Sequence, residues 1–496
     1  MPDYRKRIDR LAAGRLSLCF MLCGCMNLQP DIPVAEPQIP GSWPVVVSSQ
    51  TTTAAPENST PSRSVPSETI QPAILAGWRD FFLDPRLVTL IAQALASNRD
   101  THVALLNVER ARALYSAARA DTWPAPTLNA TLTRGEPASS ASVYTAGAGL
   151  TSFELDLFGR LHSLSQSALH VYLSQEAARR STELSLIAEV ATAWFTLALD
   201  QELQHIARIT LENRQKALIL NEHRYRLGAV SELDLAEART AIETARSDLA
   251  SYNGQVMEDL NALTLLVGSP VVPSLLPHRF DVPDQPFVAL SAGLPSEVLL
   301  HRPDVLQAEQ QMRAANAEIG AARAAFFPSI SLTTSIGYAS SALSALFSGG
   351  SRAWNFIPQI SLPVFQREKL WANLAVSQAD RDIALAEYEK TIQTGFKEVA
   401  NALSWKASLD QQRTAQEALV SAATRTERLS RLRYEQGRDN YIVLLDAERT
   451  LYSAQQSLAQ TRWSQYTNQI TLYKVLGGSW AAHPMPDPAE TLQNRF

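Results

Sequence analysis

The segment from Arg160 to Leu227 contains neither glycine nor proline, and its apolar residues recur at spacings of three and four. This periodicity is typical of one face of a helix. At a rise of about 1.5 Å per residue, such a helix would be on the order of 100 Å long. Gly228 can end it, and Ser231 can cap the helix that follows. The pattern therefore predicts long antiparallel helices over about 159–227 and 231–267.

The second half of the chain repeats this plan at an offset of 209 residues. The matched positions are Glu189-Val-Ala with Glu398-Val-Ala, Gly228 with Gly437, and Gly268 with Gly477. A constant offset over such a distance indicates an internal duplication. It predicts two further long helices, over about 366–436 and 439–476, joined by a tight turn at Gly437.

Each half also contains two stretches in which polar and apolar residues alternate, which is the pattern of a strand with one apolar face. Strands are expected at about 126–134, 142–158, 328–340 and 351–365. In the second of these the alternation changes phase before Phe153, which predicts a bulge or a twist midway along the strand. The odd-numbered polar positions are Thr127, Asn129, Thr131, Ser329, Ser331 and Thr333.

Composition restricts how such a chain can meet a membrane. The residues are 46% hydrophobic but only 7% aromatic, which favours helices packed through alanine and leucine. The mean hydropathy is −0.11, and no uncharged apolar run reaches the roughly 18 to 20 residues of a membrane-spanning helix. Any membrane crossing must therefore use the strands. The formal net charge is −5, which argues against nucleic acid as a partner.

The three cysteines, Cys19, Cys23 and Cys25, lie in or beside a short apolar run that follows a basic segment. This layout predicts a signal peptide over 1–24. The end of the run, Leu22-Cys23-Gly24-Cys25, resembles the lipobox of bacterial lipoproteins, which implies lipid attachment at Cys25. The alternative is an ordinary cleaved signal peptide with an incidental cysteine. A leader rich in Pro, Ser and Thr follows and is expected to run in extended form over 25–72.

Four strands cannot close a membrane barrel alone, because open edges would leave backbone groups unsatisfied in lipid and known barrels have eight strands or more. Either the chain oligomerises or its strands are not transmembrane. A soluble sheet packed on helices is the alternative, since half-buried strands in soluble proteins alternate in the same way.

The lipobox, the paired strands that follow proline, Arg302-Pro303-Asp304, and the segment from Tyr434-x-x-Gly437 to Leu445-Asp446-Ala447 together resemble the TolC family of outer membrane efflux factors, in its OprM/CusC/NodT-like lipoprotein branch. The resemblance covers the chain from Cys25 to about Gly478. It implies a mainly α fold with a small β part, in which a homotrimer forms a twelve-stranded barrel in the outer membrane and a helical coiled-coil barrel in the periplasm. It also implies two partners, a periplasmic adaptor protein and an inner-membrane pump of the RND type.

The resemblance also assigns roles to residues at the turn around Gly437. Asp446 and Ile442, four residues apart on one helix face, match a periplasmic gate in which three symmetry-related carboxylates face one axis. Tyr434 matches a tyrosine that locks the closed tip of the hairpin to a neighbouring helix, and Ser231 and Glu232 match its polar partners in the first repeat. The other residues implied in the latch or in adaptor contact are Gly437, Arg438, Asp439 and Gly228. Asp439 and Val443 depart from some relatives, where an arginine and a second aspartate stand, so the latch is expected to differ in detail.

The predicted organisation is a first repeat over 73–268, a linker over 269–294, a second repeat over 295–477 and a tail over 478–496. No HExxH or similar ligand spacing, phosphate-binding glycine loop or nucleophile elbow is present, so neither an enzyme nor a metal or cofactor site is expected beyond the lipid on Cys25. The interpretation is a passive duct for small molecules such as drugs. A structural coiled-coil lipoprotein of the envelope and a type I protein-secretion duct are the alternatives.

Overall fold

The computed structural model of the chain describes residues 27–33, 35, 40, 77–134, 142–280, 286–288 and 296–478. The predicted signal peptide, Cys25, most of the leader and the tail after Gly478 lie outside these residues. The chain divides into two compact units, and each unit draws on both sequence repeats. The sheet unit comprises Met1–Pro37, Leu105–Ala178 and Leu306–Thr391, and the helical unit comprises Gln38–Ala104, Arg179–Val305 and Ile392–Phe496.

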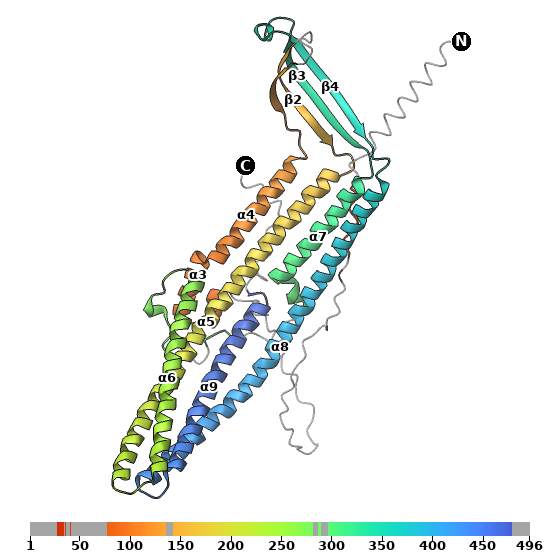
Figure 1. The fold of residues 1–496 in the computed structure, drawn as a ribbon. Helices are drawn as coiled ribbons and strands as arrows, with labels where there is room; N and C mark the ends of the chain where they lie inside the picture. Colours follow the sequence, from red (N-terminus) through yellow and green to blue (C-terminus); the bar gives the residue numbers. More distant parts are fainter. Residues whose placement is uncertain are drawn as a thin grey trace, which may run out of the picture. The chain divides into compact units, whose positions relative to one another are not determined.

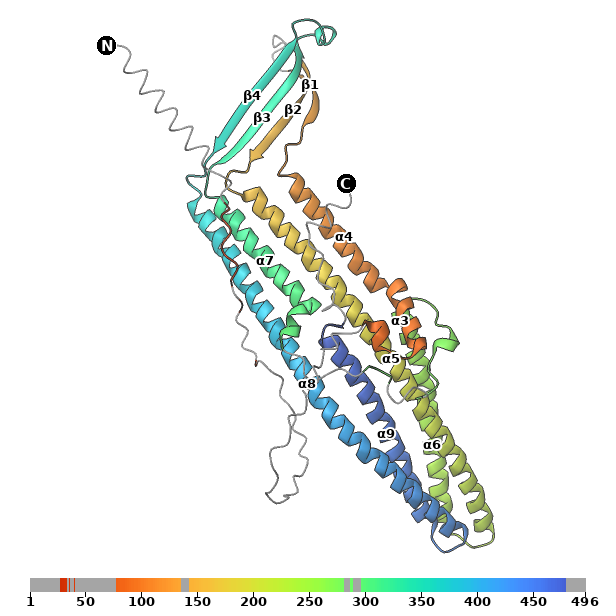
Figure 2. The ribbon, with the colours of Figure 1, turned by 180° about the vertical axis from the view of Figure 1, so that it is seen from behind.

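The sheet unit contains one antiparallel sheet in the order β1-β2-β3-β4 (Figures 1 and 2). The strands are β1 (Thr127–Thr133), β2 (Val143–Leu155), β3 (Ser329–Ser340) and β4 (Arg352–Ser361), each within a few residues of its predicted bounds. The register of β2 on β3 shifts between Leu150 and Phe153, and Ser152 has a φ of 55°. The predicted bulge is therefore confirmed. Within the described residues β1 and β4 each pair on one side only, so this sheet has two open edges.

One aromatic contact and one salt bridge lie where the sheet meets the helices of the same unit. Phe158, after β2, stacks on Phe327, before β3, with ring centroids 4.6 Å apart. Arg160 begins α5 (Arg160–Arg226) and forms a salt bridge of 2.6 Å with Glu154 of β2. Parts of α4 (Arg99–Ala120), α7 (Pro303–Ala324) and α8 (Arg367–Glu435) complete the unit.

The helical unit contains two long hairpins, α5 with α6 (Glu232–Val267) and α8 with α9 (Tyr441–Val475). Their turns lie side by side at one end of the unit (Figures 1 and 2). Shorter elements pack at the opposite end of α6 and α9, namely α2 (Trp78–Phe81), α3 (Pro85–Ser97), η1 (Pro273–Leu275) and η2 (Ser296–His301). Asp84 caps α3 by accepting a hydrogen bond from the Arg86 backbone nitrogen, and Pro85 occupies the first helical position.

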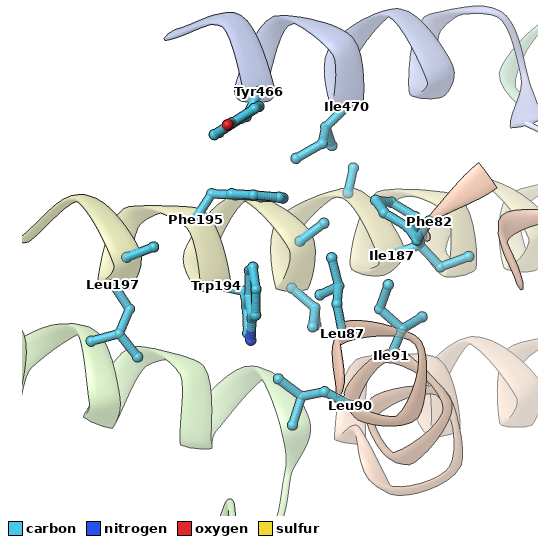
Figure 3. Close-up of a cluster of buried hydrophobic side chains, with 14 of the residues drawn as sticks. Phe82, Leu87, Leu90, Ile91, Ile187, Trp194, Phe195, Leu197, Tyr466 and Ile470 are labelled. Carbon is cyan, nitrogen blue, oxygen red and sulfur yellow. The ribbon is translucent and has the colours of Figure 1, made fainter. Parts of the chain in front are cut away.

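The largest core cluster of the helical unit surrounds Trp194 and Phe195 of α5 (Figure 3). Trp194 is fully buried, and its Nε1 donates a hydrogen bond to the carbonyl of Leu275 (3.0 Å). Phe280 and Phe287 also lie in this cluster, although both fall in the segment that the sequence assigned to a linker. The described part of that segment therefore contributes side chains to the core, because its phenylalanines fill the space between α5 and α9.

Only α5, among the described helices, contains an 18-residue window long and apolar enough to span a membrane. This window was not predicted from the sequence. In the structure 61% of it is buried inside the protein. The same test is passed by core helices of soluble proteins, and Trp194 and its neighbours give α5 that role here.

Candidate functional site

The six predicted polar strand positions lie on one face of the sheet. Thr127 pairs with Gly149, Gly149 with Ser335, and Ser335 with Asn355, so these four residues form one cross-strand row. Thr127, Asn129 and Thr131 are alternate residues of β1, and Ser329, Ser331 and Thr333 are alternate residues of β3. Alternate residues of a strand point to the same face of the sheet. Thr131 and Thr145 join across the strands through their hydroxyls, 2.5 Å apart.

The opposite face of the sheet is apolar and uncovered. Leu128, Ala148, Ile336 and Trp354 form a second cross-strand row, in which Leu128 is 87% exposed and Trp354 is 77% exposed. Phe356 and Ile360 extend this surface along β4 and are also exposed. A sheet with one polar face and one exposed apolar face suits a boundary between water and lipid.

Both hairpin turns depend on a glycine in the left-handed region. Gly228 and Gly437 each have a φ of 70°, and no atom lies within 4 Å of the position where a Cβ would stand. The glycines are therefore required by the backbone conformation and not by crowding. Ser231 caps α6 through a capping box with Asp234. Asn440 is the N-cap of α9 but forms no hydrogen bond with its side chain.

Asp439 is bound within its own turn. Its carboxylate accepts hydrogen bonds from Arg433 Nε (2.6 Å) and Nη2 (2.7 Å). The hydrogen bond from Arg433 lowers the pKa of Asp439. Asp439 is thus an acceptor for the arginine six residues earlier, and it stabilises the turn around Gly437.

Tyr434 connects the two hairpins inside the chain. The Tyr434 hydroxyl donates to Asn221 Oδ1, and Arg224 donates to the backbone carbonyls of Tyr434 (3.1 Å) and Glu435 (3.0 Å). The Arg224 guanidinium also lies over the Tyr434 ring, 4.5 Å from its centroid. Burial raises the pKa of Tyr434, so its hydroxyl remains a donor.

Within one copy of the chain, the described partners of Tyr434 are therefore Asn221 and Arg224, and not Ser231 and Glu232, which the resemblance implies. Ser231 and Glu232 are exposed at the start of α6, where Ser231 serves as the helix cap, and neither bonds to Tyr434 in the part of the chain described. Arg438 is exposed, and its backbone nitrogen donates to the carbonyl of Arg433. Asn221 and Arg224 were missed because they precede the turn on the other hairpin, 213 and 210 positions away from Tyr434.

Asp446 and Ile442 lie together on the exposed face of α9, next to Val443. The opposite face of the same turns carries Tyr441 and Leu445, which are buried in the tip cluster with Ala238 and Ala241 of α6. The packing fixes the rotation of α9, so the Asp446 carboxylate projects away from its own chain. This orientation agrees with the predicted pairing of the two residues on one face.

A second ion pair joins α8 to α9 farther from the turn at Gly437. Glu448 is only 7% exposed and accepts a hydrogen bond from Arg431 Nη2 (2.9 Å). Burial raises the pKa of Glu448, and the neighbouring Arg431 opposes this shift. The pair of Arg431 and Glu448 was not predicted from the sequence, although Glu427 and Arg431 stand at the i,i+4 spacing of a helix ion pair.

An acidic pair joins α5 and α6 nearer the core. Burial and a hydrogen bond with Asp200 raise the pKa of Asp259 to about 7. Burial also raises the pKa of Asp200. Two neighbouring carboxyl groups disfavour double ionisation, so Asp259 is partly protonated at neutral pH. Among the described residues, no group of three or more His, Cys, Asp or Glu side chains is placed to hold a metal ion.

The chain is similar to a protein family, to curated relatives and to solved structures. A family model described as outer membrane efflux protein matches residues 90–269 and 294–478. The probable efflux pump outer membrane protein TtgC of Pseudomonas putida is 42% identical over 470 residues, which cover 93% of this chain and 94% of TtgC. The cation efflux system protein CusC of Escherichia coli is 41% identical over 417 residues, covering 82% and 88%. The open-state MtrE outer membrane channel of Neisseria gonorrhoeae superposes with a TM-score of 0.79 at 35% identity, covering 92% of this chain and 98% of that structure.

Proposed function

Because the chain belongs to the outer membrane efflux protein family, we propose that three copies of it form the passive exit duct of a tripartite exporter. The family match establishes an outer membrane component of an efflux system. The trimer, the gate residues and the identity of the partners are our proposal. In it the duct performs no bond-making chemistry, and the energy for transport comes from the pump.

The main support for this proposal is the structure of the sheet. It has a polar face, an exposed apolar face and two open edges, β1 and β4, within the described residues. In lipid the unpaired backbone groups of those edges need partners. Pairing β4 of one copy with β1 of the next closes twelve strands in a trimer. The row of Thr127, Ser335 and Asn355 then lines a wet lumen, and Leu128 and Trp354 face lipid.

The gate is proposed to lie at the hairpin tips. Asp446 and Ile442 project from α9 on a face that their own chain leaves exposed. Three-fold symmetry would bring three carboxylates and three isoleucines around one axis. The carboxylate ring would attract multivalent cations, and the isoleucine ring would narrow the passage.

The contact between Arg224 and Tyr434 is proposed as the latch that holds the two hairpins together at rest. It joins the end of α5 to the end of α8, so separating the hairpin tips would require breaking it. The tips around Gly228 and Gly437 are the proposed contact surface for a periplasmic adaptor, and an RND-type pump in the inner membrane is the proposed source of substrate. Cys25 is proposed to carry the lipid that anchors the mature N-terminus.

Small organic compounds are the proposed substrates. TtgC and related proteins of Pseudomonas putida carry names that refer to toluene, solvent and antibiotic efflux, at 41% to 43% identity. The chain covers 87% to 94% of the length of these relatives. CusC, named for cation efflux, is comparably similar, so metal cations are the second candidate.

The export assay compares cells that contain a pump and adaptor but lack an outer membrane channel with the same cells expressing this chain. Expression is expected to lower the steady-state accumulation of a fluorescent organic substrate and to raise solvent tolerance. Copper or silver tolerance is measured in parallel to test the second candidate. If accumulation and all tolerances are unchanged while the protein is present in the outer membrane, the proposed duct is refuted.

A further inference from the structure

A short piece of the leader lies against the last turns of α7 in the sheet unit, where it is drawn in red beside α7 (Figure 2). Arg323 Nη1 donates a hydrogen bond to the carbonyl of Leu28 (3.1 Å). Asn316 Nδ2 donates one to the carbonyl of Pro30 (2.9 Å). Asn316 is 3% exposed, so the leader contributes to covering it. The two donors are seven residues apart, or two turns along one face of the helix.

Gly320 lies between these two donors and makes room for the side chain of Gln29. A Cβ at Gly320 would stand 2.6 Å from Gln29 Cγ and 2.6 Å from Ser163 Oγ of α5. Glycine weakens a helix interior relative to alanine. Gly320 has no positive φ that would require it. The close approach of the leader on one side and of Ser163 of α5 on the other therefore explains why glycine stands here.

The duplicated helix α4 shows that this arrangement is particular to α7. In the segments that lead into β1 and β3 the two repeats align at an offset of 204 rather than 209, since Ala117-Ala-Arg119 matches Ala321-Ala-Arg323 and Pro124 matches Pro328. At this offset Ser116 matches Gly320 and Arg112 matches Asn316. The Ser116 side chain is exposed and bonds back to the carbonyl of Arg112 (2.9 Å). The arginine is thus shared by both repeats, but the glycine and the asparagine that receive the leader occur only in the second.

We propose that Asn316, Gly320 and Arg323 form a binding seat for the leader of the same chain, and that this seat determines where the N-terminal lipid leaves the protein. The seat lies at the end of α7 that leads into β3. Cys25 precedes Leu28 by three residues, a reach of about 10 Å in extended chain. The part that concerns the lipid rests on the proposed lipidation of Cys25, whereas the seat depends only on residues 28–30 and α7.

The seat is held by the two carbonyl contacts and by packing. Gln29 Nε2, Ser163 Oγ and Asn316 Oδ1 are buried there and form no hydrogen bond with other described residues. A larger side chain at Gly320 would occupy the space of the Gln29 side chain and is therefore the most direct perturbation. The test uses full-length protein that carries Gln29→Cys, and it measures the rate at which the new thiol reacts with a maleimide. Adding Gly320→Leu is expected to raise this rate roughly tenfold or more, because an overpacking penalty of this scale would displace the leader from α7. Ser116→Leu on α4 is the matched control and is expected to leave the rate unchanged.

A cross-link provides the second measurement, which does not depend on the leucine variant folding. The pair Gln29→Cys and Gly320→Cys is expected to form a disulfide under mild oxidation, because a Cβ at Gly320 lies 3.3 Å from Gln29 Cα. The pair Gln29→Cys and Ser116→Cys is expected not to form one. Both reactions are read by mass spectrometry of the linked peptides.

Repeating the experiment with Cys25→Ser separates the seat from the lipid. The Gly320 pair is expected to cross-link equally well, since the seat binds residues 28–30. Cross-linking that disappears with Cys25→Ser would mean that the lipid, and not α7, holds the leader, and would overturn the proposal. Equal maleimide rates in the Gly320→Leu and Ser116→Leu proteins, or equal cross-linking of the two cysteine pairs, would also overturn it.

Discussion

Arg224→Ala is expected to increase the open probability of the channel. The guanidinium of Arg224 donates two hydrogen bonds across the hairpins, at 3.1 Å to Tyr434 and 3.0 Å to Glu435, and lies 4.5 Å from the centroid of the Tyr434 ring. Alanine removes all three interactions without changing the helix, since it is the best helix former. If this contact holds the resting tip, its loss raises the energy of that state alone.

The size of the effect can be worked out from these contacts. Arg224 is half-buried, so each hydrogen bond contributes about 1 kcal/mol and the cation–π contact about 0.5–1 kcal/mol. Together they stabilise the closed tip by about 2.5–3 kcal/mol, which corresponds to about a 60- to 140-fold change in the equilibrium. A channel open about 0.1% of the time would then be open several per cent of the time.

Single-channel recording in planar bilayers measures this open probability. Arg226→Ala is the matched control, because the side chain of Arg226 bonds to Glu222 and His223 within its own helix. Its open probability is expected to equal that of the wild type. If Arg224→Ala and Arg226→Ala behave alike, the contact between Arg224 and Tyr434 is not a latch.

Three further predictions concern folding and insertion. Trp354→Arg is expected to reduce the amount of protein in the outer membrane, because an arginine facing lipid costs about 2–4 kcal/mol. Asn355→Arg on the polar face is expected to be tolerated, and equal amounts of the two variants in the membrane would contradict the assignment of the faces. Arg302→Leu removes hydrogen bonds to Val475 (2.8 Å), Asp304 and Glu398 and is expected to destabilise the protein by about 3 kcal/mol, seen as a lower Tm that Arg302→Lys partly restores. The pKa of Asp259 rises from 3.8 to about 7 on folding, so between these values the native state binds an extra proton, and the stability that this proton confers declines with rising pH until pH passes about 7. The Tm of Asp259→Asn is expected to lack this decline, and an identical pH profile would refute the raised pKa of Asp259.

Periodicity and helix-stop signals were sufficient to predict the long helices and all four strands. Runs without glycine or proline, a glycine at each turn and alternation of period two are local properties, and the observed bounds differ from the predicted ones by only a few residues, as in α5 and β3. The segment around Phe280 was predicted less well because its prolines indicate a linker. Its burial depends on packing against helices that are distant in sequence.

The site was predicted only in part. Ile442 and Asp446 could be placed on one helix face from their spacing, and the structure agrees. The partners of Tyr434 could not be predicted, because Asn221 and Arg224 belong to the other hairpin and only tertiary packing brings them close. The pair Glu448 and Arg431 has a weak local signal, but its burial again depends on how α8 and α9 pack.

The most direct test of the gated duct is single-channel conductance of the purified protein, with and without Asp446→Ala. The wild type is expected to show discrete conductance steps that a trivalent cation blocks from one side. Asp446→Ala is expected to raise the conductance and weaken the block, while Asp382→Ala, which removes a carboxylate paired with Arg381 on α8, should change neither. Absence of discrete steps would contradict the duct, and an unchanged block in Asp446→Ala would contradict the carboxylate ring.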